Sequence, residues 1–447
     1  MTATLPASPP GAAPRGAATL LERFLEVRHR TETLAEPLGP EDQTVQSMPD
    51  VSPTKWHRAH VSWFFETFVL QPFVPGYEPF HPLYGYLFNS YYEAVGDRYP
   101  RPARGHVSRP GVAEIGSYRR HVDERVADLL AGGGRGTLPV EAARLVELGC
   151  HHEEQHQELL LMDAKHVLSC SPVEAAYAAS PLPLPLPLPP APAPAPAGKV
   201  QPPRPGAGGG FVAHEGGEVA IGHGGDGFAF DNEGPRHLER LVPFELAAGL
   251  VTAGQWQAFV EDGGYRRAEL WLSDGWATVQ REGWVAPLYW RDEGGGGHSV
   301  FTLSGRRQLD EAEPVCHVSY YEADAFARWA GARLPTEGEW EAVAGAAPVE
   351  GNFLESGRLH PVAGGGWLGD AWVWTASAYL PYPGFRPAPG AVGEYNGKFM
   401  VNQHVLRGGA CVTPQGHVRG TYRNFFPPSA RWPFTGVRLA RDLGEAA

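Results

Sequence analysis

The chain has 447 residues, of which 43% are hydrophobic and 13 are tryptophan, so it can bury large cores and should hold two or three domains. Its 50 acidic residues outnumber its 37 basic residues, and the formal net charge is −13. This charge disfavours nucleic acids and anionic membranes as partners and suits cationic small molecules.

The N-terminal segment 1–18 is rich in Ala, Pro and Gly but lacks the apolar stretch of a signal peptide. We expect it to be a disordered tail on a cytoplasmic protein. No apolar run has the length needed to span a membrane. The cysteines Cys150, Cys170, Cys316 and Cys411 have unrelated spacings, which match neither a disulfide framework nor a zinc ribbon, so reduced thiols are expected.

Helical patterns dominate the first half of the chain. They occur at 20–36, 53–70, 112–131 and 139–168. This arrangement predicts a four-helix bundle domain over 19–179, with a long insertion between the second and third helices. Metal sites in such bundles are built from side chains on facing helices.

The last of these helices carries the most informative pattern in the chain. His152 and His156 lie four residues apart on the same apolar stripe as Leu145, Leu148 and Leu159. Core histidines bonded to carbonyl groups are the structural alternative. Two imidazoles on one buried stripe are hard to satisfy in that way, so the pattern favours a metal ion.

The segment 152–156 also matches the H-E-x-x-H motif, which makes a zinc protease the obvious competing interpretation. The extended form of that motif is absent, because Leu159 and Met162 occupy the positions of its Gly and its third His. A downstream glutamate ligand stays open, with Glu174 as one candidate.

Segment 180–210 consists of Pro-Leu and Ala-Pro repeats that end in a glycine run, and this composition is typical of an extended linker. The remaining residues, 211–447, are rich in Gly, Trp and short β-like runs, with helical patterns at 321–330 and 337–344. We expect an irregular α+β domain there.

Several longer phrases accompany the histidine pair. They are 50–60 (DVSPTKWHRAH) and 88–96 (FNSYYEAVG) in the first half, and 332–341 (ARLPTEGEWE) and 405–409 (VLRGG) in the second. With them the chain resembles the ergothioneine-biosynthesis sulfoxide synthases. The first half is similar to all-α, DinB-like metal-binding bundles, and the second half is similar to the α+β, C-type-lectin-related domain of formylglycine-generating enzymes. The resemblance runs from the first helix to Asp442.

The resemblance implies a mononuclear non-haem iron enzyme that uses O₂ to join a thiol to C2 of the imidazole ring of Nα-trimethylhistidine, giving a sulfoxide. It implies an Fe(II) cofactor held by His60, His152 and His156. Three neutral imidazoles suit Fe(II) and leave coordination positions open. We expect His57, one turn before His60, to support the site or to pack beside it, and His151 to be a surface residue.

The resemblance also assigns residues near the reacting ring. Tyr91 and Tyr92 lie in the insertion, where the family places an active-site tyrosine that donates a proton, and we expect ordinary packing for one of the two. Gln155 matches a glutamine that contacts the substrate imidazole.

The C-terminal run 423–428 (RNFFPP) is the expected recognition site for the trimethylammonium group. Aromatic faces suit a quaternary ammonium, so Phe425 and Phe426 are the candidate contacts, and Asn424 is the candidate for the substrate carboxylate. Core packing is the alternative role for either phenylalanine.

The thiol is expected to be cysteine. The branch that uses γ-glutamylcysteine should carry Asn-Trp-Asp at 424–426, and the acid is missing here. Asp50 with Arg101 or Arg104 would then hold the amine and the carboxylate of cysteine, although either arginine could instead form a loop salt bridge.

Other functions stay open at this point. γ-Glutamylcysteine remains the alternative thiol. An ovothiol-type sulfoxide synthase would act on unmethylated histidine, but it normally carries a methyltransferase region that is not visible here. A metal-dependent thiol S-transferase would involve no oxygen chemistry. A formylglycine generator is supported only by Cys411, which follows Gly409.

Overall fold

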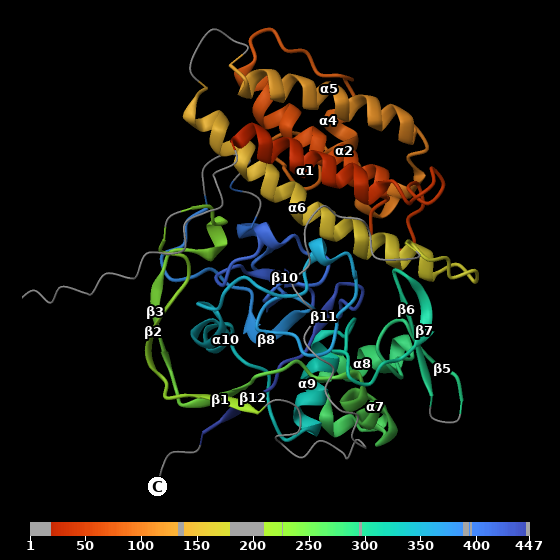
Figure 1. The fold of residues 1–447 in the computed structure, drawn as a ribbon, viewed down its shortest axis with the longest axis vertical. Helices are drawn as coiled ribbons and strands as arrows, with labels where there is room; N and C mark the ends of the chain where they lie inside the picture. Colours follow the sequence, from red (N-terminus) through yellow and green to blue (C-terminus); the bar gives the residue numbers. More distant parts are fainter. Residues whose placement is uncertain are drawn as a thin grey trace, which may run out of the picture.

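The computed structural model describes residues 19–132, 138–178, 210–225, 227–294, 297–387, 393 and 396–443. The tail expected at 1–18 lies outside the described residues, as does the expected linker 180–210 apart from Gly210. Figure 1 shows two layers, a helical one above and a mixed one with several small sheets below. Helix α6 runs along the boundary between them.

The upper layer is built on the four expected helices, α1 (Leu20–Ala35), α2 (Thr54–Phe65), α5 (Val112–Leu130) and α6 (Val140–Ser169). Helix α2 continues through a π-helical turn, Glu66–Leu70. Helices α1 and α2 pack on α6, and α5 packs on α2. The core between them is largely aromatic, and α2 is buried along its whole length because neighbouring elements cover it on every side.

The insertion between α2 and α5 contains α3 (Gln71–Phe73), α4 (Tyr84–Phe88) and a 3₁₀ helix, Arg101–His106. Glu66, at the end of α2, holds the insertion to the bundle. It accepts hydrogen bonds from the hydroxyl groups of Tyr77 and Tyr118, each at 2.7 Å. The later part of the insertion contacts the start of α2, where Nε1 of Trp56 donates to the carbonyl oxygen of Leu87 at 3.1 Å and Arg104 donates to the hydroxyl oxygen of Ser52 at 2.9 Å.

Over its described residues the lower layer is an α+β domain with four small sheets, whose strand orders are β1-β4-β12, β10-β9-β8-β11, β2-β3 and β5-β6-β7. Strand β11 pairs parallel to β8, and the other named pairs are antiparallel. The strands are β1 (Phe211–His214), β2 (Gly217–Ile221), β3 (His237–Leu241), β4 (Phe244–Ala247), β5 (Trp290–Asp292), β6 (His298–Thr302), β7 (Gly305–Gln308), β8 (Trp372–Ala378), β9 (His404–Arg407), β10 (Asn424–Phe426), β11 (Thr435–Gly436) and β12 (Ala440–Asp442).

In the part of this domain that the structure describes, four α-helices lie beside the sheets. The two that the sequence predicts are α9 (Tyr320–Trp329) and α10 (Glu337–Ala344), and the other two are α7 (Ala253–Glu261) and α8 (Ser273–Glu282). Each of α7, α9 and α10 begins with a capping box, in which a Ser or Thr and the third helical residue satisfy each other's backbone N–H groups.

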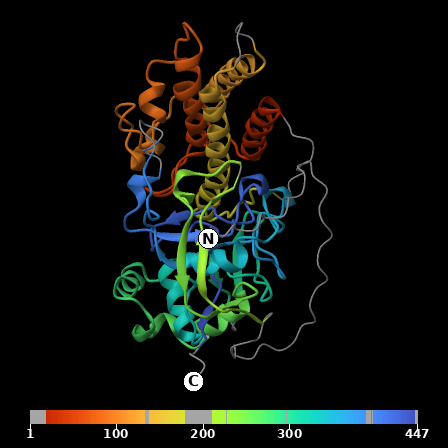
Figure 2. The ribbon, with the colours of Figure 1, turned by 90° about the vertical axis from the view of Figure 1, so that its left-hand side faces the viewer.

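Helix α6 belongs to both layers. Val146 and Cys150, in its first half, are buried in the core of the bundle. Leu160, Leu161 and Met162, in its second half, are buried in a core shared with the α+β domain. Figure 2 shows the helix running lengthwise from one layer into the other. The histidine pair therefore lies where the two layers meet.

Candidate metal centre and adjoining pocket

Three histidines from two helices converge at the base of the bundle. His60 lies on α2, and His152 and His156 lie one turn apart on α6. Each offers one ring nitrogen to a common centre, and these nitrogen atoms all lie within 4.8 Å of one another. The packing of α2 on α6 thus completes the half-site that the spacing of the pair predicts.

The ring of His60 is held in a fixed orientation. Its Nδ1–H donates to the carbonyl oxygen of Phe88 at 2.6 Å. The ring stacks between Trp56 and Trp63, at centroid distances of 4.6 and 5.4 Å. The Nε2 atom is buried and has no hydrogen-bond partner among the described residues, so its lone pair is available to a metal.

His156 is supported by a hydrogen-bonded chain. Its Nδ1 lies 2.8 Å from Nδ1 of His57, and Nε2 of His57 lies 3.0 Å from Oδ2 of Asp163. The carboxylate accepts the Nε2–H of His57, so Nδ1 of His57 accepts the Nδ1–H of His156. This order leaves Nε2 of His156 as a lone pair. His57 therefore supports the site, as the sequence suggested.

Burial keeps the three imidazoles neutral. It lowers the pKa of His60 and of His156 well below the usual range and lowers the pKa of His152 to about 3. The neighbouring imidazoles lower the pKa of His60 and His156 further, since two cations in one buried cluster would repel. A set of three neutral imidazole donors fits a divalent transition metal.

The geometry argues against the zinc-protease interpretation of the H-E-x-x-H motif. Glu153 is fully buried and pairs with Arg28 at 2.8 Å and with Arg119 at 2.9 Å, inside the bundle. A carboxylate held in this way is not available as the general base of a metalloprotease. Glu174 pairs with Arg291 and Arg306 of the α+β domain and is not a member of the histidine cluster.

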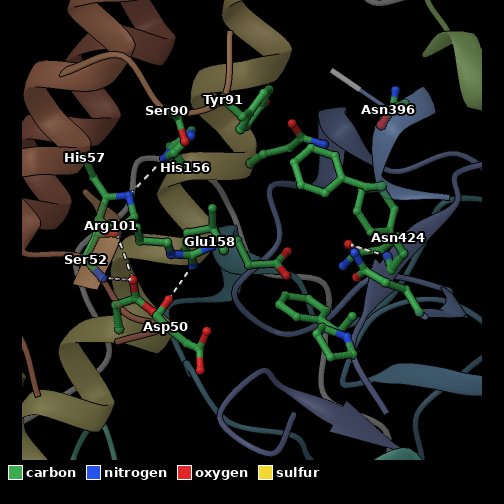
Figure 3. Close-up of a pocket in the computed structure, with 18 of the residues that line it drawn as sticks. Asp50, Ser52, His57, Ser90, Tyr91, Arg101, His156, Glu158, Asn396 and Asn424 are labelled. Atoms are coloured by element: carbon green, nitrogen blue, oxygen red, sulfur yellow. Dashed lines mark hydrogen bonds and ion pairs between the residues drawn. The ribbon is translucent and has the colours of Figure 1, made fainter. Parts of the chain in front are cut away.

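A pocket of about 260 Å³ adjoins the cluster through His156, and both domains contribute to its walls. Figure 3 shows His156 and Tyr91 on one side, Asn396 and Asn424 on the opposite side, and Glu158 between them. Most of the substrate-contacting residues proposed from the sequence meet at this pocket. They are Asp50, Tyr91, Arg101, Arg104, Gln155, Asn424, Phe425 and Phe426.

The two candidate tyrosines face different surroundings. Tyr91 lines the pocket and packs edge-on against Phe399 of the α+β domain, at 5.1 Å. Tyr92 is buried and packs against Trp63 and Phe68 of the bundle. The structure therefore places Tyr91 at the pocket and Tyr92 in the core.

One end of the pocket is basic. Arg104 is buried, donates to the hydroxyl oxygens of Ser52 and Ser90, and stacks on Trp56 at 3.3 Å. No ion pair joins it to an acid among the described residues, and burial lowers its pKa well below the usual range. Arg101 donates to the backbone carbonyl oxygen of Asp50.

The other end of the pocket is aromatic. Phe425 stacks on Tyr379 at 4.1 Å and lies 5.9 Å from the ring of Phe399. Phe426 packs edge-on against Trp432 at 5.8 Å. Phe425, Phe426 and Trp432 all line the pocket.

Sequence reasoning missed several pocket residues. Glu158 accepts hydrogen bonds from Trp372 at 2.7 Å and from Thr413 at 2.5 Å, and burial raises its pKa to about 7. Asp163 and Trp432 also line the pocket and bond to each other at 3.1 Å. Only the position of Glu158 and Asp163 on the same helix as the histidine pair could have pointed to them.

The expectation for His151 was wrong. It is buried rather than exposed, because the α+β domain covers that face of α6. Its Nδ1 lies 3.2 Å from Oε2 of Glu154 and 3.1 Å from Nδ1 of His417. Burial lowers the pKa of both histidines, and hydrogen bonds from them contribute to a pKa of Glu154 well below the usual range, despite its burial.

Comparisons with known proteins agree with this architecture. Residues 23–160 match the DinB superfamily, and residues 198–366 match the sulfatase-modifying factor enzyme 1-like domain. A hercynine oxygenase of Mycobacterium tuberculosis is 33% identical over 428 residues, which cover 88% of this chain and 92% of that protein. The chain belongs to the hercynine oxygenase family. It is therefore an enzyme, and its fold class is the bundle plus α+β combination expected from the sequence.

Other relatives support the same assignment. The hercynine oxygenase of Mycolicibacterium thermoresistibile is 30% identical, with 95% of each chain covered. The formylglycine-generating enzyme of Streptomyces coelicolor is 34% identical but covers only 38% of this chain and 57% of its own length. That likeness concerns one domain alone. None of the described helices combines the length and the apolar character needed to cross a membrane.

Proposed function

We propose that the protein is an Fe(II)- and O₂-dependent sulfoxide synthase that joins the sulfur of cysteine to C2 of the imidazole ring of hercynine, Nα-trimethylhistidine. The thiol loses its hydrogen, C2 loses its hydrogen, one oxygen atom enters the sulfoxide and the other leaves as water. One observation carries the proposal. A buried cluster of three histidines opens onto a pocket with one basic and one aromatic end.

The donor set favours iron. Three neutral imidazoles, with no carboxylate in the cluster of described ligand atoms, suit Fe(II) and leave positions for substrates. When bound, Fe(II) supplies the redox chemistry needed to use O₂. The protein orients the ligands by hydrogen bonds. The carbonyl of Phe88 directs Nε2 of His60 toward the metal position, and His57, held by Asp163, does the same for Nε2 of His156.

The basic end suits the carboxylate of cysteine. Arg104 is a buried cation that forms no ion pair among the described residues, so an anionic ligand would stabilise it. Asp50 lines the same end and offers a carboxylate to the amine of cysteine. The loop salt bridge considered from the sequence is found for neither arginine within the described part of the chain. Arg101 instead bonds to a backbone carbonyl.

The aromatic end suits the trimethylammonium group of hercynine. A quaternary ammonium has no hydrogen to donate and is bound by aromatic faces, a contact worth about 2 kcal/mol when it is desolvated. Phe426 and Trp432 offer such surfaces beside Phe425. Asn424 uses Oδ1 to accept the N–H of Phe425 at 2.9 Å, so its amide N–H groups would donate to the substrate carboxylate.

Tyr91 is the proton donor of this proposal. Its ring lines the pocket, and a phenol can deliver a proton to a developing negative charge during the reaction. Tyr92 keeps a packing role.

Mass spectrometry of the products tests the proposal. Iron-loaded protein is incubated in air with hercynine and either cysteine or γ-glutamylcysteine, with an anaerobic sample and a His60→Ala variant as controls. The expected product is the cysteine sulfoxide, formed only in air and not by the His60→Ala protein, which should also lose iron. Faster turnover of γ-glutamylcysteine would reassign the thiol. Preference for unmethylated histidine would favour the ovothiol-type reaction, and a thioether formed without O₂ would favour an S-transferase.

A further inference from the structure

Lys165 is a buried cation that the proposed chemistry does not use. It lies in the second half of α6 and is fully buried. Its ammonium lies over the rings of Tyr289 and Phe434, at 4.7 and 4.9 Å from their centroids, and Nζ lies 2.7 Å from Nε2 of His317. Because burying a charge is costly, the contact with His317 points to a role for this lysine.

The hydrogen bonds of His317 have a fixed direction. Its Nδ1 lies 3.2 Å from the carbonyl oxygen of Trp432. A carbonyl oxygen only accepts, so Nδ1 carries a proton. Burial and the charge of Lys165 lower the pKa of His317 well below the usual range, so the ring is neutral and Nε2 is a lone pair. Lys165 therefore donates to His317, and His317 donates to the backbone of Trp432.

Trp432 is held at two points by α6. Its carbonyl oxygen is linked through His317 to Lys165, and its indole Nε1 donates to Oδ1 of Asp163 at 3.1 Å. Lys165 and Asp163 belong to α6, whereas Trp432 lies between β10 and β11 of the α+β domain. The segment that carries Trp432 is thus fixed by the same helix that carries His156.

Trp432 also presents an aromatic surface to the pocket. It lines the pocket, and its ring meets Phe426 edge-on at 5.8 Å, with the two planes at 82°. No other aromatic ring among the described residues packs against it. Phe425 differs, because its ring stacks on Tyr379 at 4.1 Å. An aromatic face that no other ring covers can receive a cation.

We propose that Trp432 determines specificity for the trimethylammonium group, and that Lys165 and His317 are positioning residues that hold it at the pocket together with Asp163. This inference rests on the proposed function, which supplies the cationic substrate. Lys165 acts on substrate selection without touching the substrate, because its hydrogen bond to His317 fixes the backbone from which the indole projects.

Discrimination between hercynine and histidine tests the inference, because the two ligands differ only in the methyl groups on the amine nitrogen. Each is titrated into iron-loaded protein without O₂, in the wild type, Trp432→Leu and Lys165→Met. We expect the preference for hercynine, as a ratio of dissociation constants, to fall roughly threefold to thirtyfold in Trp432→Leu, the range for a partly to fully desolvated cation–π contact. In Lys165→Met it should fall roughly threefold with iron content unchanged, because the indole is loosened rather than removed. A general loosening of the fold would weaken both ligands equally and leave the ratio unchanged.

Lys55→Met is the matched control. Lys55 is a buried lysine of α2, and its Nζ donates to the carbonyl oxygens of Ser108 and Pro110, each at 3.3 Å. The preference should stay at the wild-type value in this protein. In a Trp432→Leu background, adding Lys165→Met should lower the preference no further. Wild-type discrimination in either single variant, equal losses in both backgrounds, or an equal loss in Lys55→Met would overturn the proposal.

A second measurement needs no substrate. Hydrogen exchange of the Trp432 indole N–H is followed by ¹⁵N NMR of the zinc-loaded protein, with the signal identified by Trp432→Phe. We expect slow exchange in the wild type and in Lys55→Met, and faster exchange in Lys165→Met, because Asp163 alone then fixes the indole. His317→Gly should act in the same way, and glycine suits the left-handed backbone of this position, whose φ is 66°.

Exchange that is unchanged in both Lys165→Met and His317→Gly would refute the positioning role. If the wild type binds no hercynine at all, the proposed function fails, while the exchange rates still decide whether Lys165 and His317 hold Trp432.

Discussion

Replacing Asp163 by asparagine should weaken metal binding although Asp163 is not a ligand of the cluster. Its carboxylate accepts three hydrogen bonds. Oδ2 accepts from the N–H of Ser52 at 2.8 Å and from Nε2 of His57 at 3.0 Å, and Oδ1 accepts from Nε1 of Trp432 at 3.1 Å. An asparagine has one acceptor oxygen, so at least one of these donors would face an NH₂ group.

The consequence reaches the metal through the histidine chain. If the NH₂ group takes the place of Oδ2, His57 must accept at Nε2 and carry its proton on Nδ1, facing His156. His156 then shifts its own proton to Nε2 and loses the lone pair that a metal needs. If the NH₂ group instead takes the place of Oδ1, the amide oxygen still accepts from His57, but the NH₂ group opposes the indole N–H of Trp432 and the cost falls on the stability of the fold. Changes of this kind behind a metal ligand cost about 10-fold to 100-fold in metal affinity, or about 1.4 to 2.7 kcal/mol.

The assay is a competition titration of the metal-free protein with Co(II) or Fe(II) against a chelator of known affinity. Asp123→Asn is the matched control, since Asp123 pairs with Arg28 of α1 at 2.5 Å and is not a member of the histidine cluster. An Asp163→Asn protein that melts like the wild type and binds metal with unchanged affinity would refute the hydrogen-bonded chain as the support of His156.

Three further predictions concern other residues. Tyr91→Phe should shift the products from sulfoxide toward plain thiol oxidation to sulfinate, whereas Tyr92→Phe should leave the product ratio unchanged, as chromatography with mass detection would show. We expect the wild type to prefer hercynine over histidine by more than roughly tenfold in kcat/KM, and Phe425→Leu and Phe426→Leu should each reduce that preference. If all three proteins discriminate equally between the two substrates, both phenylalanines are packing residues. Burial lowers the pKa of Lys165 from 10.5 to about 8. Between pH 8 and pH 10.5 the Lys165 amine is therefore protonated in the unfolded chain but largely neutral in the folded protein. The free energy of unfolding should rise by about 3 kcal/mol over this pH range through this group. Denaturant unfolding should show this component lost in Lys165→Met, and an identical pH slope in both proteins would contradict it.

The helices of the bundle follow from local pattern. Leu20–Ala35 and Val140–Ser169 begin and end within one residue of the ranges expected from the sequence, because apolar residues at steps of three and four bury one stripe wherever the helix packs. The spacing of His152 and His156 set half of the metal cluster in the same way. His60 came only from the family resemblance, because nothing in its local pattern links it to a helix that lies far away in the sequence.

Tertiary packing decided the surroundings of several side chains that the sequence periodicity could not distinguish. Adjacent residues such as Tyr91 and Tyr92 have the same chemistry, and only the fold of the insertion turns one to the pocket and the other to the core. A helical wheel likewise puts His151 off the apolar stripe of α6, but it cannot say that a second domain covers that face.

The sequence by itself therefore determined the helices, the histidine pair and the family. The tertiary structure decided how the pocket is closed, since its walls come from residues far apart in the chain. Asp163 and Trp432 are hydrogen-bonded across a separation of 269 residues, and Gln155 and Tyr422 across 267. Such contacts depend on how two domains dock, and docking is set by the complementarity of whole buried surfaces rather than by any local run of residues.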